Sequence, residues 1–226
     1  MRFVERQARL EKRTFEAIDE LEDIFNVEIP DYPEVRWLGR LGHFEDLGLP
    51  EYYREEVECL KAQRCSVLMS KSKVIILNRD CPEHINEETS HFVHTEVSGI
   101  YYEDKDPEDM IHLRALVEMF GYLGSKLLDP SRKNSFKDFP DYFAIACRQE
   151  VGFHKFAEIV GDIMNGDASE RLIHSQGYGL AERIFCALQT RQAKMGYFQK
   201  LIRQNLNGAG EATKTFKDLR KEFWPY

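Results

Sequence analysis

No two of the five cysteines form a Cys-x-x-Cys pair, and their number is odd (Cys59, Cys65, Cys81, Cys147 and Cys186). This pattern excludes both a disulfide framework and a zinc ribbon. The N-terminal segment lacks the apolar core of a signal peptide. No run of residues approaches the roughly 18 apolar residues of a membrane span. We therefore expect a cytoplasmic protein with no membrane segment.

The sequence also lacks an excess of cations. It carries 31 Lys and Arg against 39 Asp and Glu, a net charge of −8. Dedicated binding to nucleic acid needs clustered cations for the phosphates, so this function class is not expected. With 42% hydrophobic and 31% charged residues, the composition is typical of a globular protein. The length of 226 residues allows one large domain or two small ones.

One stretch has no Lys or Arg at all, from Asp80 to Asp104. It nevertheless contains three histidines and many carboxylates (Asp80, Glu83, Glu87, Glu88, Glu96, Glu103 and Asp104). Carboxylates gathered without a basic partner repel one another unless a cation or bound protons offset their charge. A bound metal ion is the cation that this local composition favours.

Within this stretch, residues 84–94 have the periodicity of an amphipathic helix. His84, Glu87, Glu88, His91 and His94 would share one side, at about 100° per residue. Pairs spaced i,i+3 or i,i+4 place their β-carbons about 5–6 Å apart, which is close enough for two side chains to bind one ion. His84 and His91 lie two turns apart, so one ion would not bind both.

Two segments together resemble a known family. The apolar run Val74 to Asn78 is followed by Asn86-Glu-Glu-Thr-Ser-His-Phe-Val-His94. This arrangement is similar to the strand and motif helix of IrrE/ImmA-type zincins, whose motif is His-Glu-x-x-His. Here the motif reads Glu-Glu-x-x-His (EExxH), because Glu87 stands where the family has its first histidine. The resemblance covers residues 66 to 128.

The resemblance implies an α+β fold with a zincin-like, gluzincin-type core, made of a small sheet with a hairpin, the motif helix and a glutamate helix. It implies Glu87, His91 and Glu118 as metal ligands, and Glu88 as the catalytic residue that polarises a metal-bound water for peptide hydrolysis. Zinc is the first expectation. Manganese or iron are alternatives, because two carboxylates favour harder ions. The substrate or partner would be a peptide or protein, and the oligomeric state stays open.

Other interpretations of the same residues remain open. The side of residues 84–94 that carries the Glu and His residues could be an ordinary solvated helix face. Glu118 could likewise point to solvent beside Arg114. Glu88-x-x-His91 also fits the motif of carboxylate-bridged di-iron bundles, although a second such motif is not found. A non-catalytic metal-binding or interaction protein is a further alternative.

The patterning predicts several elements around the motif. They are a helix over 3–26, a strand over 34–38, a loop over 41–50, a helix from Pro50 to about Gln63, a hairpin formed by 66–70 and 73–78, a motif helix ending near Gly99, and a helix from Pro107 to Leu128.

After residue 128 the pattern is almost wholly helical. We expect a linker over 129–135 and a helical C-terminal region over 138–226, separate from a metallopeptidase-like core over 1–128. Glycines predict helix breaks near Gly166, at Gly177–Gly179 and at 208–210. His154 with Glu158, and His174 with Glu170, are interpreted as surface pairs.

Overall fold

A computed structural model describes residues 3–38, 43–55, 57–58, 66–78, 82–99, 107–134, 168–204 and 209–224. The fold is α+β and mostly helical. The helices are α1 (Phe3–Phe25), α3 (Pro82–Ser98), α4 (Pro107–Leu128), α7 (Ala168–Ala187), α8 (Arg191–Ile202) and α9 (Ala209–Phe223). The strands are β1 (Glu34–Trp37), β2 (Val67–Met69) and β3 (Val74–Leu77), with short 3-10 turns over Phe44–Leu47 and Glu51–Tyr53.

The three strands form a mixed sheet in the order β1-β3-β2. β3 is central, parallel to β1 and antiparallel to β2, with Leu68 opposite Ile75. All four residues of β3 are buried, as a central strand of β-branched and aliphatic residues requires. Lys73 precedes β3 with a positive φ of 51° and closes the turn from β2. The predicted hairpin is therefore confirmed.

The motif helix and the glutamate helix have the predicted bounds. α3 ends at Ser98, and Gly99 follows it at a φ of +66°, a left-handed conformation that suits a glycine after a helix C-terminus. Pro107 occupies the first turn of α4, where its missing N–H is not needed. The expected helix from Pro50 begins as the 3-10 turn Glu51–Tyr53, and much of its remainder lies outside the described residues.

The predicted helix break at Gly177–Gly179 is wrong, because α7 continues through both glycines. They permit close packing instead. A Cβ added to Gly177 would lie 2.6 Å from the Ala115 carbonyl oxygen and 2.7 Å from the Glu118 Cβ. One added to Gly179 would lie 2.7 Å from the Trp224 ring. A helical glycine can mark contact between helices as well as a break, and sequence periodicity alone does not separate the two.

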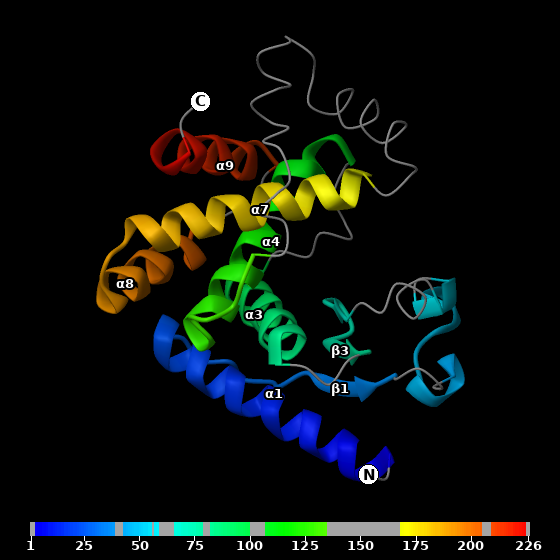
Figure 1. Cartoon of the computed structure of the whole chain (residues 1–226). Coiled ribbons are helices and arrows are strands. Elements are labelled where there is room, and N and C mark those ends of the chain that lie inside the picture. Colours follow the sequence, from blue (N-terminus) through cyan, green and yellow to red (C-terminus); the bar gives the residue numbers. More distant parts are fainter. Residues whose placement is uncertain are drawn as a thin grey trace.

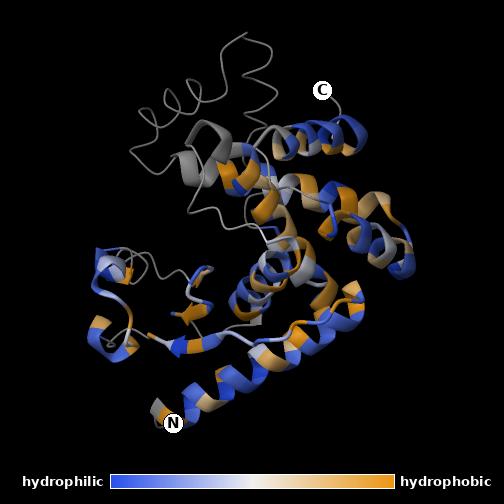
Figure 2. Ribbon diagram, turned by 180° about the vertical axis from the view of Figure 1, so that it is seen from behind, coloured by the Kyte–Doolittle hydropathy of each residue, from blue (hydrophilic) through white to orange (hydrophobic). Residues whose placement is uncertain are grey.

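α4 forms the centre of the helical assembly. It packs against α3 on one side and α7 on the other, while α1 lies along α3 and β1 (Figure 1). Most of the described apolar residues of α4 are buried with those of α1, α3, α7, α8 and α9 in one hydrophobic core. Figure 2 shows apolar residues concentrated along α4 and many hydrophilic residues on α1 and α9. Among the described residues, no helix has the length and apolar character needed to cross a bilayer.

The segment after α4 is partly built into this core. Residues 129–134 belong to the expected linker, yet Arg132 is buried and bonded to α3 and α4. Elements from both predicted regions, 1–128 and 138–226, also share the hydrophobic core. The expectations at Gly166 and at His154 with Glu158 lie outside the described residues, as does the Glu170 side chain.

Candidate metal centre

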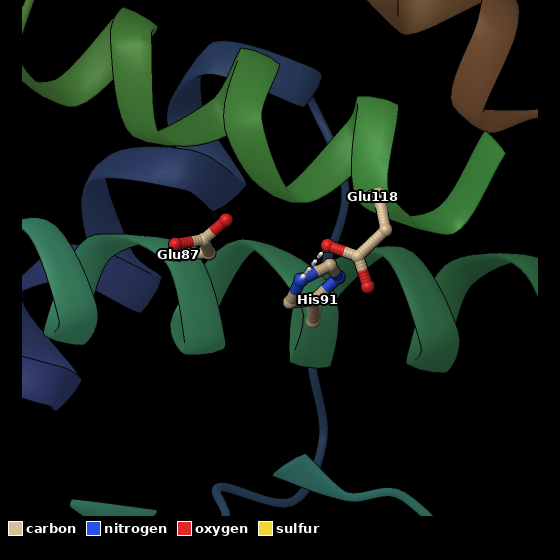
Figure 3. A group of neighbouring side chains, drawn as sticks. All are labelled: Glu87, His91 and Glu118. Atoms are coloured by element: carbon tan, nitrogen blue, oxygen red, sulfur yellow. Dashed lines mark ion pairs between the residues drawn. The ribbon is translucent and has the colours of Figure 1, made fainter. Parts of the chain in front are cut away.

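The three residues proposed as ligands come together between α3 and α4. One donor atom from each of Glu87, His91 and Glu118 lies within 4.8 Å of the other two. Glu118 points from α4 toward the imidazole of His91 on α3, and Glu87 lies one turn earlier on α3 (Figure 3). The Glu118 side chain is only 15% exposed. The alternative in which it points into solvent beside Arg114 is therefore wrong.

Two glycines of α4, Gly121 and Gly124, allow α3 to pack closely against α4 at this cluster. A Cβ on Gly121 would lie 2.3–2.8 Å from atoms of the His91 ring, and one on Gly124 would lie 2.4 Å from the Ser90 hydroxyl oxygen. Real side chains are essentially never that close, so both positions require glycine in this packing. The Ser90 hydroxyl donates to the Asn86 carbonyl, 2.6 Å away, and so has its own partner inside α3. The two glycines of the Gly-Tyr-Leu-Gly sequence of α4 thus leave room for α3 to place His91 beside Glu118.

The expectation that the carboxylates of this stretch lack basic partners is wrong for Glu87. Arg132 binds its Oε2 at 2.6 Å, and the Tyr178 hydroxyl donates to its Oε1. Arg132 lies 45 residues away in sequence, so a local search for Lys and Arg could not find it. Glu96 also has a cation, with Lys73 Nζ 2.7 Å from its Oε2.

Arg132 is itself held on several sides. Besides Glu87 it bonds the Ser125 hydroxyl and the Glu83 carbonyl. Its guanidinium also lies over the Tyr122 ring, 4.9 Å from the centroid. A bound carboxylate and an aromatic neighbour together fix the position of a buried guanidinium. Glu87 is thereby oriented, in the way that hydrogen bonds commonly orient a ligating carboxylate.

Glu88, the proposed catalytic residue, lies between this cluster and the sheet. It is 8% exposed, and its carboxylate accepts a hydrogen bond from the backbone of Leu68 in β2. Burial raises its pKa well above the usual range, and the charges of Glu87 and Glu118 raise it further. The Leu68 bond and Arg132 act in the opposite direction. Within the described part of the sheet, β2 is an edge strand, so Glu88 is next to an edge.

His94 has different surroundings from His91. Its ring stacks on Phe120 with 4.0 Å between centroids, and neither ring nitrogen has a hydrogen-bond partner among the described residues. Burial, with a smaller contribution from His91, lowers the pKa of His94 to about 3. A histidine in this state is a neutral core residue. His91 also has one buried nitrogen, Nδ1, with no hydrogen-bond partner in the described part of the chain, while its Nε2 lies 3.7 Å from Glu118 Oε2.

Besides Arg132 and Tyr178, sequence reasoning missed His174 of α7 at this site. Its Nε2 lies 3.3 Å from Glu118 Oε2, so the interpretation of His174 as part of a surface pair did not identify this neighbour. The signal that could have found it is the spacing of His174, Gly177 and Tyr178. These residues lie at i, i+3 and i+4 on one face of a helix.

The donor set fits a divalent ion chemically. Imidazole nitrogen and carboxylate oxygen are both zinc ligands, and they bind at about 2.0–2.2 Å. Atoms within 4.8 Å of one another need only small side-chain rotations to reach a common ion.

Comparisons of the chain with family models, curated proteins and solved structures found no match. The assignment of this site therefore depends on its own geometry.

Proposed function

We propose that this protein is a metallopeptidase-like protein that binds one divalent metal ion through Glu87, His91 and Glu118. The observation that carries the proposal is the convergence of these three side chains, from two helices, within 4.8 Å. Their order along α3 and α4 is also the order that the resemblance to zincins implies. Three protein ligands leave a coordination position open, which is typical of catalytic rather than structural zinc sites.

When bound, such an ion supplies Lewis-acid chemistry that turns water into a nucleophile near neutral pH. Glu88 supports peptide hydrolysis by its position, because its carboxylate is close enough to Glu87 and Glu118 to interact with their charges. A carboxylate next to a metal-bound water is suited to accepting and returning a proton. The β2 edge next to Glu88 could bind an extended peptide by strand addition.

A second candidate is a non-catalytic metal-binding protein. The contacts of Glu87 favour it, because Arg132 and Tyr178 already engage both carboxylate oxygens. A carboxylate neutralised by arginine donates less charge to a metal ion and weakens the site. In this candidate the ion would contribute to stability and to partner binding, without hydrolysis.

The substitution Glu88→Gln separates these candidates. The variant keeps the shape of the side chain but cannot accept a proton, so we expect it to retain the metal and to lose cleavage of an unstructured substrate such as casein. Glu45→Gln, at an exposed position of the 3-10 turn Phe44–Leu47, is the matched control and should keep both properties. Cleavage that is unchanged in Glu88→Gln would contradict the proposed role of Glu88. Absence of cleavage in the wild-type protein, with metal bound, would favour the second candidate.

The number of ions separates both candidates from a carboxylate-bridged di-iron site. Anomalous scattering from crystals grown with zinc or manganese should locate one ion at the cluster. Two ions less than about 4 Å apart would contradict the mononuclear proposal and support the di-iron class.

A further inference from the structure

We infer that His174 of α7 is an additional ligand of the proposed metal ion and gives the site a second imidazole. This inference depends on the proposed metal site, which it extends from two helices to three. The resulting donor set has two nitrogens and two carboxylates. Such a set is more selective for zinc over manganese than Glu87, His91 and Glu118 alone.

The first argument is the distance between donors. Glu118 Oε2 lies 3.7 Å from His91 Nε2 and 3.3 Å from His174 Nε2. Both separations exceed the 2.7–3.2 Å range of good N–H···O hydrogen bonds. Two donors bound to one tetrahedral ion at about 2.1 Å lie about 3.4 Å apart. Each imidazole thus lies at about the distance from this carboxylate oxygen that is expected of two ligands of one ion.

The second argument is that helix packing fixes the position of His174. Three contacts between α4 and α7 follow one another at intervals of one turn. The first is Glu118 with His174. The second is the stack of Tyr122 on Tyr178, with 4.5 Å between ring centroids. The third is the ion pair of Lys126 Nζ with Glu182 Oε1, 3.1 Å apart. The register of α7 on α4 therefore directs His174 toward Glu118.

Gly177 makes this register possible. The backbone of α7 lies directly against α4 at Gly177, where even a methyl group would meet the Ala115 carbonyl oxygen and the Glu118 Cβ. His174 and Tyr178 lie one turn before and one residue after this contact, on the same face of α7. His174 contacts Glu118, and Tyr178 donates to Glu87. The same face of α7 thus contacts two of the three proposed ligands.

His174 lies outside the group of three whose donor atoms are all within 4.8 Å, so its ring must rotate to complete the coordination. Its side chain is 30% exposed, which leaves room for that rotation and makes a substitution there tolerable for folding. With four protein ligands the site would be closed to water, as in structural zinc sites, so a fourth ligand at His174 favours the non-catalytic candidate over the hydrolytic one. Loss of the His174 bond would reopen one position.

The test is a competitive titration of the full chain with zinc and, separately, with manganese. In His174→Ala we expect zinc affinity to fall about 100-fold or more and manganese affinity to fall less than about 5-fold, because a nitrogen donor is lost. His174→Asp supplies an oxygen donor instead. It should regain affinity, with the preference shifted toward manganese. His43→Ala, in an exposed loop, is the matched control and should bind both ions like the wild-type protein.

The visible spectrum of the cobalt-substituted protein gives a second readout. A ligand change from imidazole to water should alter the position and intensity of the cobalt absorption bands in His174→Ala, but not in His43→Ala. Equal losses of zinc and manganese affinity in His174→Ala, with an unchanged cobalt spectrum, would overturn the inference and indicate a purely structural role. Unchanged zinc affinity would also overturn it. A wild-type protein that binds neither ion would instead overturn the proposed site itself.

Discussion

The two ends of the cluster between α3 and α4 neutralise their carboxylates in different ways. At one end, the arginine end, Glu87 is bound by Arg132 and Tyr178. At the other, the histidine end, the ion pairs of Glu118 within the described structure are with His91 and His174. Arginine stays charged at all physiological pH values, whereas a histidine pairs as a cation only when protonated.

This difference indicates where a metal ion would contribute most. The arginine end is a complete ion pair, oriented by hydrogen bonds and by contact with aromatic rings. At the histidine end, no permanent positive charge among these contacts offsets the Glu118 carboxylate. A bound divalent cation would supply that positive charge. Glu87 belongs to both ends, since its carboxylate pairs with Arg132 and also lies within 4.8 Å of the His91 and Glu118 donors.

The largest expected effect comes from breaking the arginine end. Arg132→Met leaves the partly buried Glu87 without its cation. Removing one partner of a buried ion pair typically lowers the free energy of unfolding by about 3–5 kcal/mol, and because the Glu87 side chain is 14% exposed we expect the lower end of that range. The additional change Glu87→Gln removes the stranded charge and should recover much of that loss. Urea unfolding of the single and double variants measures both effects. A single variant within about 1 kcal/mol of the wild-type protein would show that the pair is not structurally important.

The histidines allow a test by pH. His94 stays neutral in the folded protein, where its pKa is lowered from 6.5 to about 3. The unfolded chain takes up a proton on this residue below about pH 6.5, and the folded chain does not. The free energy of unfolding should therefore fall as the pH falls from 6.5 toward 3, by about 2 kcal/mol at pH 5.

The matched variant is His94→Leu, which removes the titrating group from the stack on Phe120. Between pH 7 and pH 5, its free energy of unfolding should fall by about 2 kcal/mol less than that of the wild-type protein. His112, whose pKa burial lowers to about 4, should leave some acid sensitivity in both proteins. Identical pH profiles for the two proteins would contradict the assignment of His94 as a buried neutral residue.

A smaller effect is expected from changing the contact that brings α7 to the histidine end. Gly177→Ala places a methyl group 2.6 Å from a backbone oxygen of α4. Overpacking costs about 1–3 kcal/mol and the gain in helix propensity is about 1 kcal/mol, so we expect a net loss of up to about 2 kcal/mol. Gly196→Ala in α8 meets nothing within 4 Å and should stabilise the protein by about 0.5–1 kcal/mol. Thermal unfolding compares the two, and a stabilised Gly177→Ala variant would contradict the packing described.

Much of the local structure was predictable from the sequence. The hairpin, the motif helix with its terminal Gly99 and the bounds of α4 follow from signals carried within each segment. The pairing of Glu87 with Arg132 could not be predicted in this way. The two residues are 45 positions apart, and Arg132 belongs to a segment whose composition is typical of a linker. The contact of His174 with Glu118 likewise depends on the register of α7 on α4. Such long-range registers depend on packing that single-segment patterns do not encode.

The central claim is that Glu87, His91 and Glu118 bind one divalent metal ion between α3 and α4. Metal content of the full chain, purified without chelator and dialysed against limiting zinc, tests this claim most directly. We expect one zinc per chain in the wild-type protein and in His43→Ala, and near-zero zinc in His91→Ala. Equal, near-zero zinc in the wild-type protein and in His91→Ala would contradict the claim, and the cluster would then be a purely structural group of buried polar residues.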